Sequence, residues 1–216
     1  MPLERTKQFP LMCLTQDGLP FSHEEQARRL CAAGAKWIQL RMKNAAPDAW
    51  RQTAAAVVKI CRAHHAICIV NDSVDVALAV GADGVHLGRD DEKWQEARER
   101  LWPDRILGGT INSEADALRA IEADCLDYVG VGPWRFTSNK KNLAPLLGAE
   151  GVRAIVQLLD GLPAWAIGGI EAEDLPAVRA TGAAGAAVSS ALFRGPSVAE
   201  NFSTLLAAWQ SPQLHS

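Results

Sequence analysis

Three polar side chains, Gln39, Arg41 and Lys43, alternate along one short segment of the chain. If this segment is a strand, alternate residues point to the same side, so all three side chains share one face. Two cations on the inward face of a sheet would be buried without partners unless an anion binds near them. The spacing therefore predicts a site for an anionic ligand, and the alternative is a strand that simply runs out into solvent.

Asp72 and Asp91 each come just after a short apolar run. Carboxylates are hard oxygen ligands that suit Mg²⁺, which takes one or two of them together with phosphate oxygens and water. A simpler reading is that both begin helices, and Asp72 would cap the segment SVDVALAV. Spacing alone leaves metal binding a hypothesis.

Small residues follow the last two apolar runs, as Gly168-Gly169 and Ser189-Ser190. In a barrel of eight strands, the loops after the seventh and eighth strands commonly bind phosphate through backbone N–H groups. His86 lies inside an apolar run and has two readings, a hydrogen-bonded core side chain or a member of the site.

Short apolar runs alternate with longer amphipathic segments along the whole chain, which predicts strands followed by helices. The expected strands cover residues 11–15, 37–41, 67–71, 84–87, 106–110, 128–131, 164–167 and 186–189. Several have apolar residues at successive positions, as expected when both faces of a parallel strand are buried.

Helix starts are also recognisable. Ser22 precedes HEEQARRLCAA as a partial capping signal, because Gln26 stands where an acid is usual, and Ala46-Pro47 opens the next helix. Ser113 fits an N-cap, and a helix over 173–181 ends at Gly182.

Eight alternations in 216 residues favour a single α/β domain over residues 1–216, a (β/α)8 barrel with a loose tail from about residue 210. The alternative is an open doubly wound sheet, but no G-x-G-x-x-G follows the first strand. In the barrel, all the polar residues that follow strands share one rim, where barrel active sites are built.

Composition excludes several classes of protein. A net charge of −3 argues against nucleic-acid binding, and no apolar stretch is long enough for a membrane span. The N-terminal residues carry charges and no signal-peptide core, and five cysteines without a C-x-x-C pair indicate thiols in a reducing cytoplasm. The sequence leaves a homo-oligomer open.

Six segments together resemble the thiamine phosphate synthase family, in the family's order and spacing from about Leu11 to Leu192. They are residues 37–43 (WIQLRMK), 71–72 (ND), 83–88 (DGVHLG), 128–133 (YVGVGP), 137–140 (TSNK) and 167–170 (IGGI). Gly108-Gly109-Thr110 and Arg135-Phe136-Thr137 are similar to a subgroup of that family.

The resemblance implies a transferase that condenses hydroxymethylpyrimidine diphosphate with hydroxyethylthiazole phosphate and releases diphosphate. It assigns the diphosphate to Arg41, Lys43, Asn71, Thr110 and Lys140, with Arg41, Lys43 and Lys140 as the catalytic cations. It assigns Mg²⁺ to Asp72 and Asp91, and the pyrimidine to Gln39 and His86. It assigns the thiazole phosphate to Thr137, Asn139, Gly169, Ser189 and Ser190. The partners implied are small phosphorylated molecules.

This chain departs from the family pattern at three positions. Thr110 replaces a commoner serine and keeps the hydroxyl, Asn139 replaces a threonine, and Asn112 stands where many relatives have histidine. Two rival functions stay open, a thiazole tautomerase, in which a histidine is expected near Asn112, and an inactive barrel that only binds phosphorylated thiazole. The Pro133–Gly148 loop is long enough to act as a lid.

Overall fold

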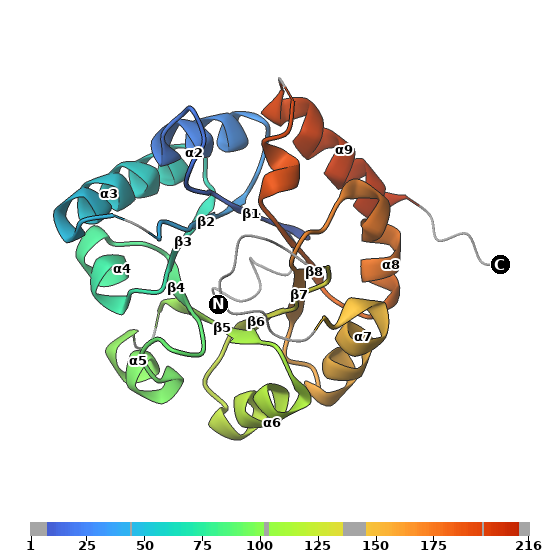
Figure 1. Cartoon of the computed structure of the whole chain (residues 1–216). Coiled ribbons are helices and arrows are strands. Elements are labelled where there is room, and N and C mark those ends of the chain that lie inside the picture. The colour runs from blue at the N-terminus through green and yellow to red at the C-terminus, as the bar shows by residue number, and fades with distance from the viewer. Residues whose placement is uncertain (1–7, 44, 102–103, 136–145, 196, 212–216) are drawn as a thin grey trace.

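Within the part of the chain that the structure describes, eight parallel strands close into a barrel in chain order (Figure 1). The structure is a computed structural model, and it describes residues 8–43, 45–101, 104–135, 146–195 and 197–211. The strands are β1 (Leu11–Leu14), β2 (Trp37–Leu40), β3 (Ile67–Asn71), β4 (Gly84–Leu87), β5 (Ile106–Ile111), β6 (Tyr128–Val131), β7 (Ala164–Ile167) and β8 (Gly185–Val188).

Helices form a ring outside the barrel (Figure 1). They are α2 (His23–Ala32), α3 (Pro47–Ala63), α4 (Val74–Val80), α5 (Trp94–Leu101), α6 (Glu114–Ala123), α7 (Gly148–Leu158), α8 (Leu175–Ala180) and α9 (Val198–Gln210), with short 3-10 turns η1 (Ala172–Asp174) and η2 (Ser190–Leu192). Serine hydroxyls cap four of them: Ser22, Ser73, Ser113 and Ser197 each accept a hydrogen bond from a first-turn N–H. Among the described residues, no helix is both long and apolar enough to cross a membrane.

Alternation along the strands divides the core into two layers. Residues such as Ile38, Val70 and Val129 face outward and pack against the helices. The intervening residues face the barrel axis and form a second cluster: Met12, Leu14, Trp37, Ile67, Ile69, Ile106, Tyr128, Trp165 and Ala187. Both faces of every strand are therefore buried, which accounts for the successive apolar residues in the sequence.

Three aromatic rings fill the middle of the inner cluster. The Trp37 ring centroid lies 5.0 Å from that of Tyr128 and 4.7 Å from that of Trp165, in edge-to-face arrangements. Gly108 on β5 makes room for them, because a Cβ at that position would lie 2.2 Å from Cζ of Tyr128. The glycine is thus required by a side chain of the neighbouring strand.

The (β/α)8 barrel expected from the sequence is confirmed, and the open doubly wound sheet is wrong. Four strands differ by a residue at an end: β1 stops at Leu14, β2 stops at Leu40, β5 continues to Ile111, and β8 runs one residue earlier than expected. The expected helix over 173–181 is divided, because η1 turns before α8 begins at Leu175-Pro176. The tail beyond Ser211 lies outside the described residues.

Candidate active site

Polar side chains occupy the inward positions near the carboxyl end of several strands. Gln39, Asn71, His86 and Thr110 each stand two residues after an inward Trp37, Ile69, Gly84 or Gly108, so all four face the barrel axis above the apolar cluster. Gln39, Asn71 and His86 are buried. The structure therefore brings these four predicted ligand-binding residues to one end of the barrel.

Hydrogen bonds link three of them through Tyr128, which the sequence reasoning did not single out. His86 lies between Tyr128 and Thr110, with Nδ1 3.1 Å from the Tyr128 hydroxyl and Nε2 2.9 Å from Thr110 Oγ1. Burial raises the pKa of Tyr128 well above its ordinary value, while a hydrogen bond from Gln39 opposes that shift. The phenol is therefore protonated and can donate to His86 Nδ1, which leaves Nε2–H to donate to Thr110. The reading of His86 as a buried, hydrogen-bonded side chain is confirmed. Its contact with Thr110 brings it next to another predicted site residue, and its own role in the site stays a prediction.

Lys43, Asp72 and Asp91 come together from three strand ends. Lys43 Nζ forms an ion pair with Asp72 Oδ2, and the Asp72 carboxyl is within hydrogen-bonding reach of Asp91. Burial raises the pKa of Asp91 above its usual value, a hydrogen bond from the Gly88 N–H at 2.6 Å lowers it, and the neighbouring Asp72 raises it again. Two adjacent carboxylates with one lysine form a cluster that favours a further cation.

The reading of Asp72 as a helix cap is wrong. Ser73 is the N-cap of α4, and its hydroxyl accepts the Val76 N–H at 3.2 Å. Asp72 has a left-handed backbone with φ of 69°, and its own N–H bonds the His86 carbonyl at 2.8 Å. This conformation directs its side chain to Lys43 and Asp91 and away from the helix that follows.

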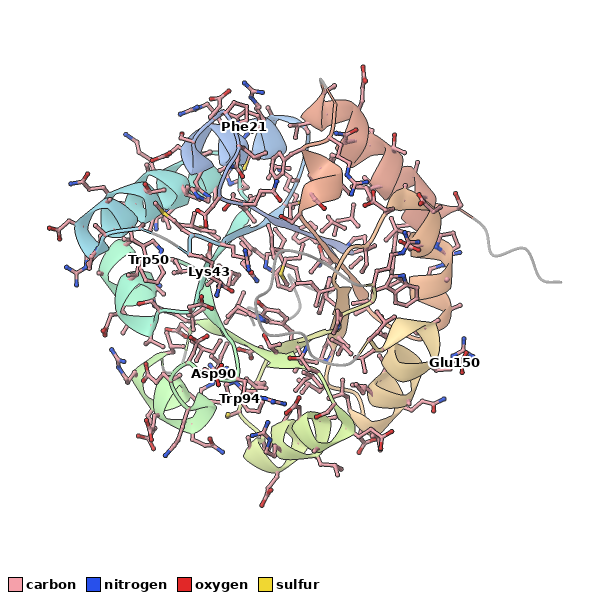
Figure 2. All side chains as sticks on the ribbon, in the orientation of Figure 1. Phe21, Lys43, Trp50, Asp90, Trp94 and Glu150 are labelled. Atoms are coloured by element: carbon pink, nitrogen blue, oxygen red, sulfur yellow. The ribbon has the colours of Figure 1, made fainter. Side chains whose placement is uncertain are left out.

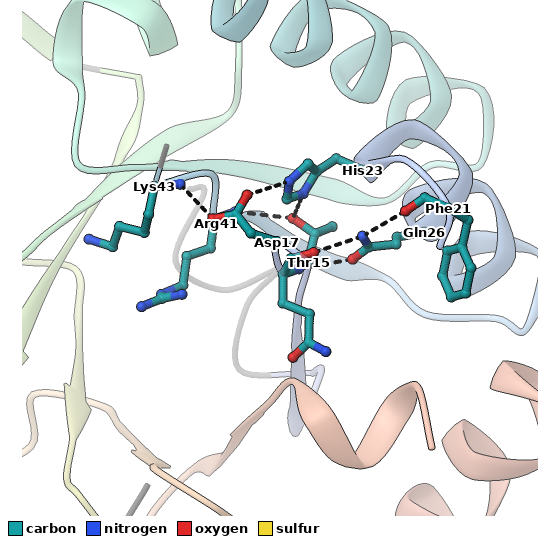
Figure 3. Close-up of polar contacts among 8 residues, drawn as sticks. Thr15, Asp17, Phe21, His23, Gln26, Arg41 and Lys43 are labelled. Carbon is teal, nitrogen blue, oxygen red and sulfur yellow. Dashed lines mark hydrogen bonds and ion pairs between the residues drawn. The ribbon is translucent and has the colours of Figure 1, made fainter. Parts of the chain in front are cut away.

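Arg41 and Lys43 lie beyond the end of β2. The alternation of side chains along the strand therefore explains why Gln39 faces the barrel axis, but it does not fix the direction of these two cations. Their side chains nevertheless project together, away from Phe21 and Gln26 (Figure 3). The half-buried Arg41 side chain makes no hydrogen bond or ion pair with any residue that the structure describes. A guanidinium in this state suits an anionic ligand. In the view down the barrel, Lys43 lies inward of α3 and α4, and Asp90 lies inward of α5 (Figure 2).

Residues of the β1–α2 loop and the first turn of α2 form hydrogen-bond networks beside this segment, and the sequence analysis did not assign them to the site. Gln26 is almost fully buried, and its side-chain amide accepts the Gln16 N–H and donates to the Gln16 carbonyl, both at 2.9 Å. Thr15, Asp17 and His23 form a second network with the backbone of Arg41 and Lys43 (Figure 3). The signal in the sequence was the pair His23 and Gln26, two polar residues one turn apart that share a helix face with the apolar Ala27 and Leu30.

The predicted phosphate loops lie side by side after β7 and β8. Gly168 and Gly169 have φ of 109° and 69°, and a Cβ at Gly168 would lie 2.8 Å from Cα of Pro133. The Ser189 hydroxyl donates to the Leu14 carbonyl at 3.3 Å or to Gln16 Oε1 at 3.0 Å, and Ser190 begins η2. These contacts connect the β8 end with the β1–α2 loop.

Asn112, which departs from the family pattern, has a structural role. Its amide donates to the Gly132 carbonyl and joins the end of β5 to the end of β6. Its backbone N–H bonds the buried carboxylate of Asp116, which also pairs with Arg89 and Arg119. Thr137, Asn139 and Lys140 lie outside the described residues, as does most of the loop expected to form a lid.

Comparisons with known proteins identify the family of this chain. The family described as thiamine monophosphate synthase matches residues 11–192. A thiamine-phosphate synthase of Bacteroides fragilis is 41% identical over 200 residues, covering 91% of this chain and 98% of that protein. One of Chlorobium phaeobacteroides is 40% identical over 185 residues, covering 86% and 89%. Among solved structures, a thiamine phosphate pyrophosphorylase from Pyrococcus furiosus has a TM-score of 0.85 and 34% identity, with 95% of this chain and 97% of that chain covered. The resemblance found in the sequence is thus confirmed, and the chain belongs to the thiamine monophosphate synthase family.

Proposed function

We propose that this chain is a transferase that condenses hydroxymethylpyrimidine diphosphate with hydroxyethylthiazole phosphate to give thiamine phosphate and diphosphate. The observation that carries the proposal is the cluster of Lys43, Asp72 and Asp91 at the barrel mouth. The Arg41 guanidinium extends from the same segment as Lys43 and has no partner among the residues that the structure describes. Relatives that cover most of the chain carry the name of this activity.

Asp72 and Asp91 fit Mg²⁺ by the chemistry of their donors. Both offer carboxylate oxygens, and their mutual repulsion is opposed by a single lysine. No group of three or more metal-binding side chains occurs among the described residues, so diphosphate oxygens and water would complete the coordination, as Mg²⁺ prefers. When bound, the ion would neutralise charge on the diphosphate leaving group.

Arg41, Lys43 and Lys140 would hold the diphosphate, with Asn71 and Thr110 as neutral hydrogen-bonding groups. When the C–O bond of the pyrimidine substrate breaks, the electron pair leaves with diphosphate and a pyrimidinylmethyl cation remains. Negative charge then grows on the departing oxygen, so these cations stabilise the transition state more than the ground state. Because His86 Nε2–H can donate to Thr110, the Thr110 hydroxyl is left to donate to the diphosphate.

The remaining residues would orient the two heterocycles. Gln39, the most buried of these polar residues, and His86 would line the pyrimidine pocket. Gly169, Ser189 and Ser190, together with Thr137 and Asn139, would bind the thiazole phosphate and aim the thiazole nitrogen at the cation, which it captures with its lone pair. No nucleophile from the protein is required.

The contacts of Asn112 argue against the thiazole tautomerase. A carboxamide cannot act as a general acid or base near neutral pH, and this one donates to the Gly132 carbonyl. The site would therefore lack the histidine expected there in that group. We also place the reaction in the cytoplasm, because the five cysteines are unpaired thiols, four of them buried.

Diphosphate release tests the proposal. Purified protein is mixed with both substrates and Mg²⁺, with one substrate omitted, and with EDTA, and released diphosphate and thiamine phosphate are measured. Release that requires both substrates and stops with EDTA is the expected result. Folded protein that binds the thiazole phosphate but releases no diphosphate would instead identify an inactive binding barrel.

A further inference from the structure

The β1–α2 loop reaches across to the segment that carries the two cations. Asp17 lies three residues past the end of β1, and its Oδ2 accepts the backbone N–H of Lys43 at 3.0 Å. Thr15 is fully buried, and its hydroxyl oxygen accepts the backbone N–H of Arg41 at 3.1 Å. Strand β2 has already ended at Leu40, so these two side chains replace a neighbouring strand as the hydrogen-bond acceptors of the segment.

His23 joins the two acceptors. Its Nδ1 lies 2.8 Å from Thr15 Oγ1 and its Nε2 lies 3.0 Å from Asp17 Oδ1 (Figure 3). Only about a tenth of the His23 side chain is exposed, against 35% for Asp17. An ionised Asp17 can only accept, so Nε2 carries a proton and donates to it. His23 is the first residue of α2, and the network therefore ties the cation segment to a packed helix.

We propose that Asp17 and His23 are positioning residues for the diphosphate end of the site, acting by fixing the backbone from which the Arg41 and Lys43 side chains extend. The proposal rests on the proposed function, which assigns those two cations to diphosphate. Without Asp17, the Lys43 N–H loses its acceptor, and among the described residues the Thr15 hydroxyl is left as the side-chain acceptor for the backbone beyond Leu40.

The order Thr15–His23–Asp17 does not make a nucleophile. Thr15 has no exposed surface, and its oxygen already accepts a backbone N–H. A hydroxyl that acts on a substrate must reach it, and this one faces the interior of the loop. The three residues therefore act on position, through Arg41 and Lys43.

Kinetics of Asp17 variants test the proposal. Asp17→Ala is expected to lower kcat/KM for the pyrimidine diphosphate by about 10- to 100-fold, the size that follows from a small misplacement of charged groups. The KM for thiazole phosphate should stay close to that of the wild type, because Gln26 holds the neighbouring Gln16 independently. Asp17→Asn should restore most of the activity, since its amide oxygen can accept the Lys43 N–H and its amide N–H can donate to the other tautomer of His23.

A matched control separates positioning from stability. Ser197 caps α9 and accepts the Glu200 N–H at 3.1 Å, so Ser197→Ala lowers Tm without touching the site. An equal kinetic loss in Ser197→Ala, or a folded Asp17→Ala with wild-type kcat/KM for the pyrimidine diphosphate, would overturn the positioning role.

Calorimetric binding of inorganic diphosphate with Mg²⁺ distinguishes this inference from the proposed function. Wild-type protein that binds diphosphate but makes no thiamine phosphate would refute the function alone, and weaker binding by Asp17→Ala would still support positioning. Wild-type protein that makes thiamine phosphate, with Asp17→Ala binding diphosphate equally well, would refute the positioning alone. No binding by the wild type would refute both.

Discussion

Replacing Gly108 by alanine should damage both the barrel interior and the site above it. A Cβ at this position would lie 2.2 Å from Cζ, 2.4 Å from Cε1 and 2.5 Å from the hydroxyl oxygen of Tyr128. These distances are far inside van der Waals contact, so one of the two side chains must move. Tyr128 has no exposed surface and packs edge-on against Trp37 and Trp165, so its ring cannot rotate away without displacing them.

The cost can be estimated from two contributions. Overpacking a filled core costs about 1–3 kcal/mol, and the rigid neighbours place Gly108→Ala near the upper end of that range. Displacing Tyr128 also breaks its hydrogen bond to His86, worth about 1 kcal/mol. The free energy of unfolding should therefore fall by about 3–4 kcal/mol. Turnover should fall too, because His86 and Thr110 lose their fixed orientation.

Urea unfolding followed by tryptophan fluorescence measures the effect. Gly130→Ala on the neighbouring strand is the matched control, because its Cβ would meet His86 Cε1 at 3.4 Å, an ordinary contact. If Gly108→Ala proved as stable as Gly130→Ala, the aromatic cluster would be looser than the structure indicates and the argument would fail.

Three further predictions concern the site and its surroundings. Asp72→Ala and Lys43→Ala should each lower turnover about 10²–10³-fold at saturating Mg²⁺, the usual effect of losing one strong electrostatic contact. Asp75→Ala, at an exposed residue, is the control, and a steady-state turnover of either variant equal to that of Asp75→Ala would contradict the prediction. Ser189→Ala should raise the KM for thiazole phosphate about tenfold through one lost hydrogen bond, and an unchanged KM would remove Ser189 from the phosphate site. Burial would raise the pKa of Asp116, but hydrogen bonds from Asn112 N–H and Ser113 and its arginine partners lower it below its ordinary 3.8. The ionised Asp116 carboxylate therefore contributes fully to the free energy of unfolding above that pH, and the contribution is lost as the pH falls through the folded pKa. Asp116→Asn should lower the free energy of unfolding by about 1–3 kcal/mol at pH 7 and by little in acid. Unfolding curves that show the same difference between variant and wild type at every pH would refute this.

The fold could be predicted because its signal is local. Both faces of each strand are buried, so apolar runs such as 67–71 mark strands to within a residue. The end of β2 was placed one residue late because Arg41 continues the alternation, while its N–H bonds the Thr15 side chain and not a strand. The alternative reading of Asp72 as the cap of α4 is wrong because Ser73 stands beside it and takes that role.

The site could be predicted in part. Lys43, Asp72 and Asp91 follow different strands, and the barrel alone brings such positions together. The contacts of Asp17 with Lys43 and of Tyr128 with His86 join residues 26 and 42 positions apart. No periodicity encodes such pairs, because they depend on how far a loop extends beyond its strand and on which ring fills the interior.

The aromatic cluster inside the barrel also limits how ligands enter and leave. Trp37, Tyr128 and Trp165 pack across the interior, so the barrel is closed to ligands at that level and open at the end that carries the site. Reactants and products must then use the same opening. We expect the pyrimidine, whose pocket is deepest, to load first and the thiazole to arrive on top of it. The product bound nearer the opening would have to leave before the one bound deeper. Slow release of either product would therefore delay the next cycle.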